Sequence, residues 1–299
     1  MQDVPTAARW LPPGAFQDQV AVVTGGGTGL GLELSRGFAA LGATVVIASR
    51  SSEHHAAFLG EAAARGWRGE AHSLDVRDEP ATRAFFDAVH ARHGRLDVLV
   101  NNAAGNFVCP AERMSANAWR AVLGIVLDGT FYCSKHAARV MRKASPAKPA
   151  GAGGALLNII ATYAWTGMAG VAHSASAKAG VLALSKTLAV EWAEHAIRVN
   201  TLAPGPFASD GAKANLWPSD AVEARIRASV PLGRFAERDE VAAQGLWLCS
   251  DACRYVTGAN LTIDGGLSLG AGRMWEPGER RERRRAADPS AAPGGEDEA

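Results

Sequence analysis

Short apolar runs rich in β-branched residues alternate with longer helical stretches along most of this chain. The apolar runs are residues 20–24, 43–49, 71–76, 96–102, 155–161, 198–203 and 260–263. The helical patterns between them cover residues 30–41, 52–65, 78–93, 117–142 and 174–195. Nearly continuous apolar strands that are separated by helices predict a parallel sheet covered on both faces. The expected fold class is therefore α/β, a doubly wound seven-stranded parallel sheet in three α/β/α layers.

The unbroken alternation predicts a single domain over residues 18–275, preceded by an N-terminal extension at residues 1–17. Residues 204–237 depart from the rhythm, because they are rich in Pro, Gly and polar residues with one short helical piece near 219–229. Long connections in a compact domain are typical of lids and binding loops, so we expect a substrate loop there. Residues 276–299 combine an Arg run with small and acidic residues, which predicts a disordered tail.

Composition excludes several classes of protein. Hydrophobic residues make up 47% and the formal net charge is +1, so nothing global favours nucleic acid or an anionic membrane as a partner. The Arg run of the tail leaves nucleic-acid binding as the less favoured alternative to a solvated segment. No apolar run reaches the roughly 18 residues that a membrane span needs. Neither end carries a secretory or peroxisomal signal, so we expect a cytoplasmic protein without membrane partners.

The cysteines give no sign of a metal site. Cys249 and Cys253 share a helical face, but no second Cys or His pair stands at ligand spacing, so no metal is expected. All four are predicted to be free, buried thiols: Cys109, Cys133, Cys249 and Cys253.

The sequence TGGGTGLG directly follows the first strand and opens the first helix. Its glycines allow a tight turn, close approach of the backbone to a pyrophosphate, and close helix–strand packing. The helix N-terminus adds free N–H groups and a positive dipole end. This context predicts a Rossmann-type dinucleotide site. The predicted cofactor contacts of this loop are Thr24, Gly25, Gly27, Thr28, Gly29, Leu30 and Gly31.

The end of the second strand distinguishes between NAD and NADP. An NAD-selective site places Asp or Glu there to accept a hydrogen bond from the ribose 2′-hydroxyl. Here the strand ends Ala48-Ser49-Arg50-Ser51, and Arg50 would pair with a 2′-phosphate. The alternative is a surface arginine at a strand end. We predict NADP(H) as the cofactor.

Over nearly its whole folded length the chain resembles the short-chain dehydrogenase/reductase family. The matching motifs are TGGGTGLG (24–31), LDV (74–76), NNAAG (101–105), SASAK (174–178), RVNTLAPGP (198–206) and IDGG (263–266). The resemblance implies that Asp75, with Val76, binds the adenine and that Lys178 holds the nicotinamide ribose. Further implied cofactor contacts are Asn101, Asn102, Ala103, Pro204, Gly205, Pro206 and Phe207. It also implies a homotetramer packed through the helices around 117–142 and 174–195.

One departure from the family pattern is informative. Most members use a Tyr four residues before the Lys as acid/base, whereas this chain has Ser174 at that position. The partner serine thirteen residues earlier is Ala161, and the helix Asn of the usual proton relay is Val126. A neutral serine cannot replace a phenol as acid, because its pKa lies far above the operating pH. Ordinary ketone–alcohol chemistry is therefore not expected.

The 2,4-dienoyl-CoA reductase subgroup has this altered pattern, and the chain resembles it. The shared motifs are NNAAGNF (101–107), ERMSANAW (112–119), VLDGTF (126–131), TY (162–163) and HSASAKAG (173–180). In that subgroup a Tyr eleven residues before the Ser does the acid work, and Tyr163 has this spacing. Asn106 matches a second hydrogen-bond donor to the thioester oxygen. The resemblance implies NADPH-dependent reduction of 2,4-dienoyl-CoA to an enoyl-CoA in unsaturated fatty acid degradation.

This chemistry needs two fixed donors rather than a proton relay. Hydride addition to the distal carbon of a dienoyl thioester collects negative charge on the thioester oxygen, as in an oxyanion hole. Tyr163 and Asn106 are the predicted donors, Lys178 orients the ribose, and Ser174 is expected to order Lys178. The resemblance assigns contacts with the CoA part to Arg77, Phe107 and Ser115. Relatives have an Arg in the loop after PGP, and here Asn215, with Lys213 nearby, falls at that place.

Alternatives remain open at this point. Tyr163 could be a loop aromatic that caps the core, and Asn106 could satisfy turn backbone groups. Trp165, Met168 and Val171 could line an acyl slot or simply pack. The chain could instead be a short-chain reductase for trans-2-enoyl-CoA or another carbonyl compound, or a catalytically silent NADP-binding protein.

Overall fold

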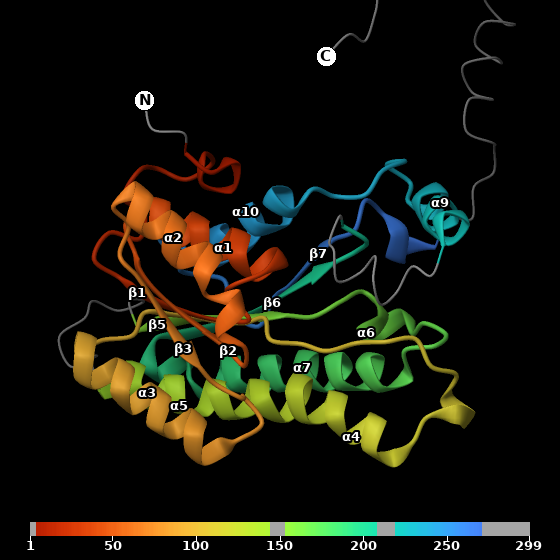
Figure 1. Cartoon of the computed structure of the whole chain (residues 1–299), viewed down its shortest axis with the longest axis horizontal. Coiled ribbons are helices and arrows are strands. Elements are labelled where there is room, and N and C mark those ends of the chain that lie inside the picture. The colour runs from red at the N-terminus through yellow and green to blue at the C-terminus, as the bar shows by residue number, and fades with distance from the viewer. Residues whose placement is uncertain (1–3, 144–152, 208–218, 271–299) are drawn as a thin grey trace, which may run out of the picture. The chain divides into compact units, whose positions relative to one another are not determined.

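The computed structural model describes residues 4–143, 153–207 and 219–270. The described residues up to Ser268 form one compact unit, with a sheet lying between two layers of helices (Figure 1). Its seven strands are all parallel and lie in the order β3-β2-β1-β4-β5-β6-β7. The predicted seven-stranded, doubly wound α/β fold is confirmed. The strand order reverses direction between β1 and β4, which is where ligands bind in open α/β sheets.

The strands and helices have the following bounds. The strands are β1 Val20–Thr24, β2 Thr44–Ser49, β3 Gly69–Ser73, β4 Val98–Asn101, β5 Gly154–Ile159, β6 Ile197–Pro204 and β7 Asn260–Ile263. The helices are α1 Gly29–Ala40, α2 Ala56–Arg65, α3 Glu79–His93, α4 Ala116–Leu123, α5 Gly129–Lys143, α6 Tyr163–Thr166, α7 Ala172–Glu191, α9 Asp220–Ser229 and α10 Arg238–Cys249.

Each face of the sheet buries its own apolar core. Along β1, Ala21 and Val23 join a cluster with α1, α2 and α10, whereas Val20 and Val22 join a second cluster with α3, α5 and α7. Successive side chains of a strand point to opposite faces, so a strand covered on both sides must be apolar at every position. This requirement produces the continuous apolar runs of the sequence.

The structure corrects several predicted element bounds. The strand predicted at 71–76 is β3 and spans Gly69–Ser73. The prediction ran too far because Leu74 and Val76 are apolar and buried, although they lie beyond the end of the strand. The predicted helix at 117–142 is α4 and α5 joined by one π-helical turn, η4 (Gly124–Asp128). Such turns often occur at functional sites.

Helix α10 is absent from the sequence prediction. Its residues are buried on most sides, so it lacks the one-sided apolar stripe by which a surface helix is recognised. A capping box formed by Glu237 and Glu240 marks its start and was the available signal.

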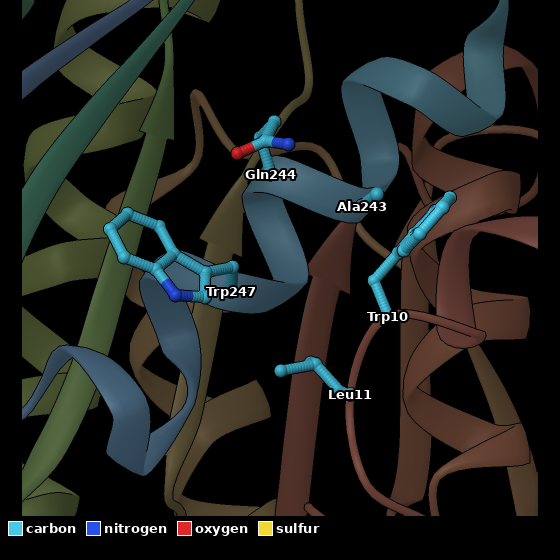
Figure 2. A pocket seen from close by; sticks show the side chains of 5 residues that line it. All are labelled: Trp10, Leu11, Ala243, Gln244 and Trp247. Atoms are coloured by element: carbon cyan, nitrogen blue, oxygen red, sulfur yellow. The ribbon is translucent and has the colours of Figure 1, made fainter.

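The N-terminal segment packs against α1 and α10. Ala7 and Ala8, in the short helix η1 (Thr6–Ala8), are buried, and the ring of Phe16 meets that of Phe38 edge-on at 4.8 Å. Beyond them, Trp10 and Leu11 line a hollow of about 170 Å³ against α10 (Figure 2).

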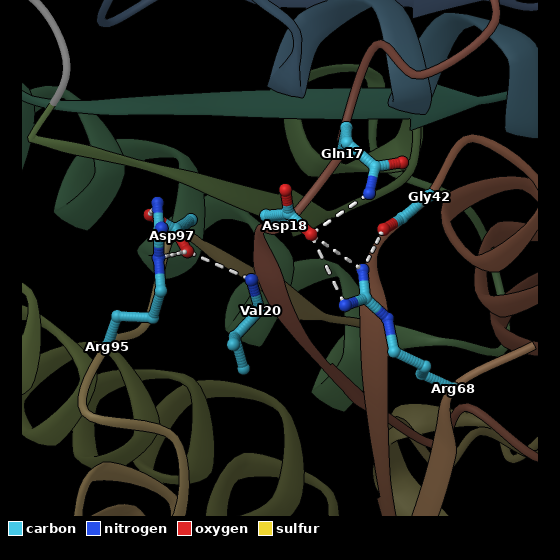
Figure 3. A network of polar contacts seen from close by, with 7 residues as sticks. All are labelled: Gln17, Asp18, Val20, Gly42, Arg68, Arg95 and Asp97. Atoms are coloured by element: carbon cyan, nitrogen blue, oxygen red, sulfur yellow. Dashed lines mark hydrogen bonds and ion pairs between the residues drawn. The ribbon is translucent and has the colours of Figure 1, made fainter.

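Ion pairs join segments at the amino ends of the strands (Figure 3). The Asp97 carboxylate accepts from the backbone N–H of Val20 at 2.9 Å and from the Arg95 guanidinium at 2.8 and 2.9 Å. Arg68 reaches both Asp18 and the carbonyl of Gly42. These contacts fix β1 and β4 at the edge opposite the predicted site.

Three further sequence expectations concern membranes, metals and thiols. Among the described residues, no helix combines the length and apolar character of a membrane span, and no cluster of three potential metal ligands occurs. The cysteines are free, and Cys133, Cys249 and Cys253 are buried as expected. The expectation for Cys109 is wrong, because it lies half-buried in the loop after β4.

Candidate active site

The glycine-rich loop after β1 has the geometry that a dinucleotide phosphate requires. Gly25 and Gly29 have φ values of 65° and 53°, a region that favours glycine. A Cβ added to Gly31 would lie 2.1 Å from the carbonyl oxygen of Gly25, so only glycine fits. Thr28, which precedes α1, makes no side-chain cap, and the first N–H groups of the helix are left for an anion. The loop therefore fits a dinucleotide.

Thr24, Asn102 and Ala103 join this loop to the end of β4. The Thr24 hydroxyl accepts from the backbone N–H groups of Asn102 and Ala103, both at 3.0 Å, and donates to the carbonyl of Val100. The Asn102 amide donates to the carbonyls of Thr24 and Gly25 at 3.2 Å. These hydrogen bonds fix the ends of β1 and β4 relative to each other, at the point where the strand order reverses.

Arg50 lies exposed just beyond β2. Its carbonyl accepts from the Ser73 hydroxyl at 3.2 Å, and its guanidinium makes no ion pair within the described residues. The turn that follows Arg50 packs on the glycine-rich loop, since a Cβ added to Gly27 would lie 1.8 Å from the carbonyl oxygen of His54.

Asp75 and Arg77 bind each other. The Arg77 guanidinium meets the Asp75 carboxylate through bonds of 2.5 to 3.0 Å, and hydrogen bonding to Arg77 holds the pKa of Asp75 below its usual value. The predicted adenine contact and the predicted CoA contact are thus direct neighbours.

Three predicted site residues converge at the carboxyl edge of the sheet. The Tyr163 hydroxyl lies 3.1 Å from the Ser174 hydroxyl and accepts from the Asn106 amide nitrogen at 3.4 Å. Tyr163 begins α6, Ser174 lies in the first turn of α7, and Asn106 belongs to the loop after β4.

The orientation of the Asn106 amide follows from its second contact. Its oxygen accepts from the backbone N–H of Phe107 at 3.0 Å, which leaves the NH₂ group facing Tyr163. Burial raises the pKa of Tyr163, opposed by its bonds with Ser174 and Asn106. The phenol therefore stays protonated at neutral pH, and both groups can donate a hydrogen bond.

Lys178 lies one helical turn beyond Ser174 and is buried, with 7% of its surface exposed. Its ammonium donates to the carbonyl of Ile159, and burial lowers its pKa to about 8. The hydrogen bond of Ser174 goes to Tyr163, so the expected ordering of Lys178 by Ser174 finds no direct contact.

Apolar side chains occupy the place of the usual proton relay. Val126, in the π-helical turn η4, is 1% exposed and packs with Val122, Ile160 and Ala177. An apolar side chain therefore stands where the usual relay has an asparagine.

The remaining predicted contacts have structural partners. The Phe107 ring meets His173 edge-on at 4.3 Å, and the Ser115 hydroxyl caps α4 by accepting from Ala118 N–H. Val171 is 2% exposed and packs inward, so it does not line an open acyl slot. Trp165 and Met168 remain exposed.

The segment that begins at the end of β6 lies against the IDGG motif. The N–H of Gly205 donates to Ile263, and the carbonyl of Pro206 accepts from Ala236. Phe207 forms a bridge with Ala236. Lys213 and Asn215 lie outside the described residues.

Asp264 is a supporting residue that the sequence prediction missed. Its carboxylate accepts from the backbone N–H groups of Gly266 and Ser268 at 2.8 and 2.7 Å. A Cβ added to Gly205 would lie 2.6 Å from that of Asp264, so the residue braces the segment with the predicted carboxamide contact. The available signal was the IDGG motif that ends the folded region.

Comparison with known proteins gives a consistent result. The model of the family described as Enoyl-(Acyl carrier protein) reductase matches residues 25–268. The chain is 42% identical over 257 residues to a probable (2E)-enoyl-CoA-producing 2,4-dienoyl-CoA reductase of Bacillus subtilis (strain 168), covering 85% of this chain and 98% of the relative. It is 40% identical over 268 residues to a (3E)-enoyl-CoA-producing peroxisomal 2,4-dienoyl-CoA reductase of Pongo abelii, covering 89% of both.

A solved structure extends the comparison. A gluconate 5-dehydrogenase of Burkholderia cenocepacia J2315, in complex with NADP and tartrate, superposes with a TM-score of 0.79 at 30% identity, over 89% of this chain and 99% of that one. The glycine-rich loop, the seven-stranded sheet and relatives that span nearly the whole fold lead to one assignment. This chain is an oxidoreductase that belongs to the short-chain dehydrogenase/reductase family.

Proposed function

We propose that this enzyme uses NADPH to reduce a conjugated acyl thioester, namely a 2,4-dienoyl-CoA, to an enoyl-CoA. The observation that carries the proposal is the convergence of the Tyr163 hydroxyl, the Asn106 amide and the Ser174 hydroxyl at the carboxyl edge of the sheet. The names of the two relatives support the substrate class. The reaction belongs to the degradation of unsaturated fatty acids.

The cofactor side of the proposal depends on the chain's own residues. Bound NADPH would supply the hydride. Gly25, Gly31 and the N-terminus of α1 would hold the pyrophosphate, because their backbone leaves room for it and directs N–H groups to it. Asp75 and Asn102 would bracket the adenosine, and Arg50, which has no ion pair within the described residues, would bind the 2′-phosphate.

The thioester oxygen is the atom that the site stabilises. Hydride delivery to the distal carbon of the diene moves negative charge onto this oxygen, and the Tyr163 hydroxyl and the Asn106 amide donate hydrogen bonds to it. A fixed donor of this kind contributes about 3 kcal/mol in the transition state. With the Tyr163 proton directed at the thioester oxygen, the Ser174 hydroxyl would donate to the Tyr163 oxygen and so orient the phenol. Lys178 orients the nicotinamide ribose and adds positive potential.

The proton that completes the reaction comes from water. Protonation of the dienolate at C2 gives a 3-enoyl product, and protonation at C4 gives a 2-enoyl product. Relatives with both product names match this chain. The two products have the same mass, so NMR of the product, which locates the double bond, identifies which carbon this site leaves open to water.

For the CoA part we propose contacts with Arg77, Phe107 and Ser115. Arg77 is exposed and bonded to Asp75, and Phe107 adjoins Asn106, so both lie next to residues of the proposed cofactor and thioester sites. Arg77 pairs with Asp75 in this structure. To bind the CoA phosphates, the Arg77 guanidinium would therefore have to contact them in addition to the Asp75 carboxylate.

The test is NADPH consumption with a 2,4-dienoyl-CoA, a trans-2-enoyl-CoA and a panel of ketones. We expect rapid turnover of the dienoyl-CoA only. Turnover of the enoyl-CoA or of a ketone instead would identify another reductase of the same family. NADPH binding without turnover of any substrate would establish the catalytically silent alternative.

A further inference from the structure

We propose that His55 is a positioning residue for the choice of cofactor. Through its contact with Ser49, it fixes the turn after β2, from which the Arg50 side chain would reach the 2′-phosphate. The inference rests on the proposed use of NADPH. It concerns a buried histidine that the catalytic chemistry does not use.

His55 is buried although it lies in the connection between β2 and α2. Only 8% of its surface is exposed, and its ring Nε2 lies 2.9 Å from the Ser49 hydroxyl oxygen at the end of β2. The bond closes a short loop, in which Arg50 and the single-turn helix η2 (Ser52–His54) are contained.

The Ser49 hydroxyl contacts both the ring of His55 and the carbonyl of Ser51, the latter at 3.1 Å. Burial lowers the pKa of His55, opposed by a hydrogen bond with the backbone of Ser49, so the ring is neutral near pH 7. A neutral imidazole has one N–H and one lone pair, and the Ser49 hydroxyl can pair with either. The result is a chain of hydrogen bonds that joins His55, Ser49 and Ser51.

This chain holds the two residues on either side of Arg50. Ser51 in turn caps η2 by accepting from the N–H of Glu53, and Ser73 on β3 donates to the carbonyl of Arg50. The backbone of Arg50 is thus fixed through the contacts of Ser49 and Ser51 and by the hydrogen bond from Ser73, while its side chain is exposed.

The same turn packs against the glycine-rich loop after β1. The carbonyl of His54 is so close to Gly27 that a Cβ there would lie 1.8 Å from its oxygen. A shift of the turn would therefore move Arg50 relative to the loop that holds the rest of the cofactor. Preorganisation of a long charged side chain favours binding, because less freedom is lost on contact.

The experiment compares kcat/KM for NADPH and for NADH at saturating dienoyl-CoA. His55→Leu removes the hydrogen bond with the Ser49 hydroxyl, and we expect the NADPH to NADH preference to fall on the order of 3- to 10-fold, the worth of one hydrogen bond. His55→Gln offers an amide, which can donate or accept a hydrogen bond, and should restore part of the preference. Ser49→Ala breaks the same chain from its other end with little change in volume, and should reproduce the loss even if His55→Leu folds poorly.

A double-mutant cycle tests whether His55 acts through Arg50. In an Arg50→Ala background, His55→Leu should change the preference no further. His195→Leu is the matched control, because His195 is half-buried in a short turn that precedes β6, at the amino ends of the strands. It should leave the preference unchanged.

Two results would overturn the inference. One is an unchanged preference in both His55→Leu and Ser49→Ala, and the other is an equal loss with both cofactors, which a merely structural role would give. A wild-type preference for NADH would instead overturn the proposed cofactor, and so is distinguishable from failure of the His55 inference.

Discussion

At the scale of single residues, burial decides what each polar group of the site can do. The Tyr163 hydroxyl is a donor because burial raises its pKa, and Lys178 titrates near physiological pH because burial lowers its pKa to about 8. Arg50 stays exposed. Each proposed role follows from these surroundings rather than from the residue type alone.

Lys178 should give the reaction a pH dependence. Its ammonium form dominates below pH about 8 and the neutral amine above it, so kcat/KM for NADPH should fall as the pH rises through about 8. In Lys178→Met we expect kcat/KM to be lower by about 10²-fold or more and this limb of the profile to be absent. A wild-type profile that is flat from pH 7 to pH 9 would show that Lys178 does not titrate in this range.

Arg50 should decide between the two nicotinamide cofactors. Arg50→Ala removes a charge-assisted contact with the 2′-phosphate, so kcat/KM for NADPH should fall about 10- to 100-fold while that for NADH stays constant. Steady-state kinetics with each cofactor measures this. Arg83→Ala, at an exposed arginine of α3, is the control and should change neither value. Equal losses with both cofactors would be inconsistent with 2′-phosphate recognition.

At the scale of elements, the glycine-rich turn and the first helix act as one unit. In Gly31→Ala the new methyl group would lie 2.1 Å from the Gly25 carbonyl and displace the turn. NADPH binding, followed by quenching of tryptophan fluorescence, should weaken at least 10-fold, as expected for a loss of about 1.4 kcal/mol or more.

Gly60→Ala is the matched control for this substitution. Gly60 is exposed within α2, and a Cβ there would meet nothing within 4 Å. It should bind NADPH normally and raise the free energy of unfolding by roughly 0.5–1 kcal/mol. Normal NADPH binding by Gly31→Ala would contradict the assigned role of the turn.

The elements also show how far the sequence predicts the fold. Strands β1 and β7 match their predicted residues, because apolar runs between polar turns have clear limits. The π-helical turn η4 and helix α10 were not predicted. The turn leaves the apolar pattern of its helix intact, and α10 is buried on most sides, so neither has a distinct periodic signal.

The candidate site was predictable to a similar degree. The resemblance to the 2,4-dienoyl-CoA reductases led to Tyr163, Asn106 and Ser174, and the structure brings them within hydrogen-bond reach. The IDGG motif was a signal for Asp264, but the contacts of Asp264 with backbone N–H groups and of His55 with the Ser49 hydroxyl arise only in the folded chain. Hydrogen bonds of this kind leave no pattern in a linear sequence.

At the scale of the whole molecule, two separate cores brace one sheet, and its carboxyl edge collects every proposed catalytic group. The helices α5 and α7 on one face expose large apolar side chains, among them Phe131 at 41% and Val190 at 79%. The resemblance implies a homotetramer packed through these two helices, so we expect these side chains to lie in its interface.

The tetramer should depend on that surface. Light scattering coupled to size exclusion should give four times the chain mass for the wild type. Phe131→Glu together with Val190→Glu would place charges in the interface and should give a smaller species. Leu59→Glu, on α2 in the other helical layer, should stay tetrameric. A wild-type monomer would contradict the proposed assembly.

The central claim is that Tyr163 donates a hydrogen bond to the thioester oxygen of a dienoyl-CoA, and the most direct test is kcat for Tyr163→Phe with 2,4-dienoyl-CoA and NADPH. The variant keeps the ring and loses only the hydroxyl, so we predict a kcat lower by about 10²- to 10³-fold with unchanged NADPH binding. Tyr255→Phe, at a fully exposed tyrosine, should keep wild-type activity. A Tyr163→Phe variant with wild-type kcat would contradict the account.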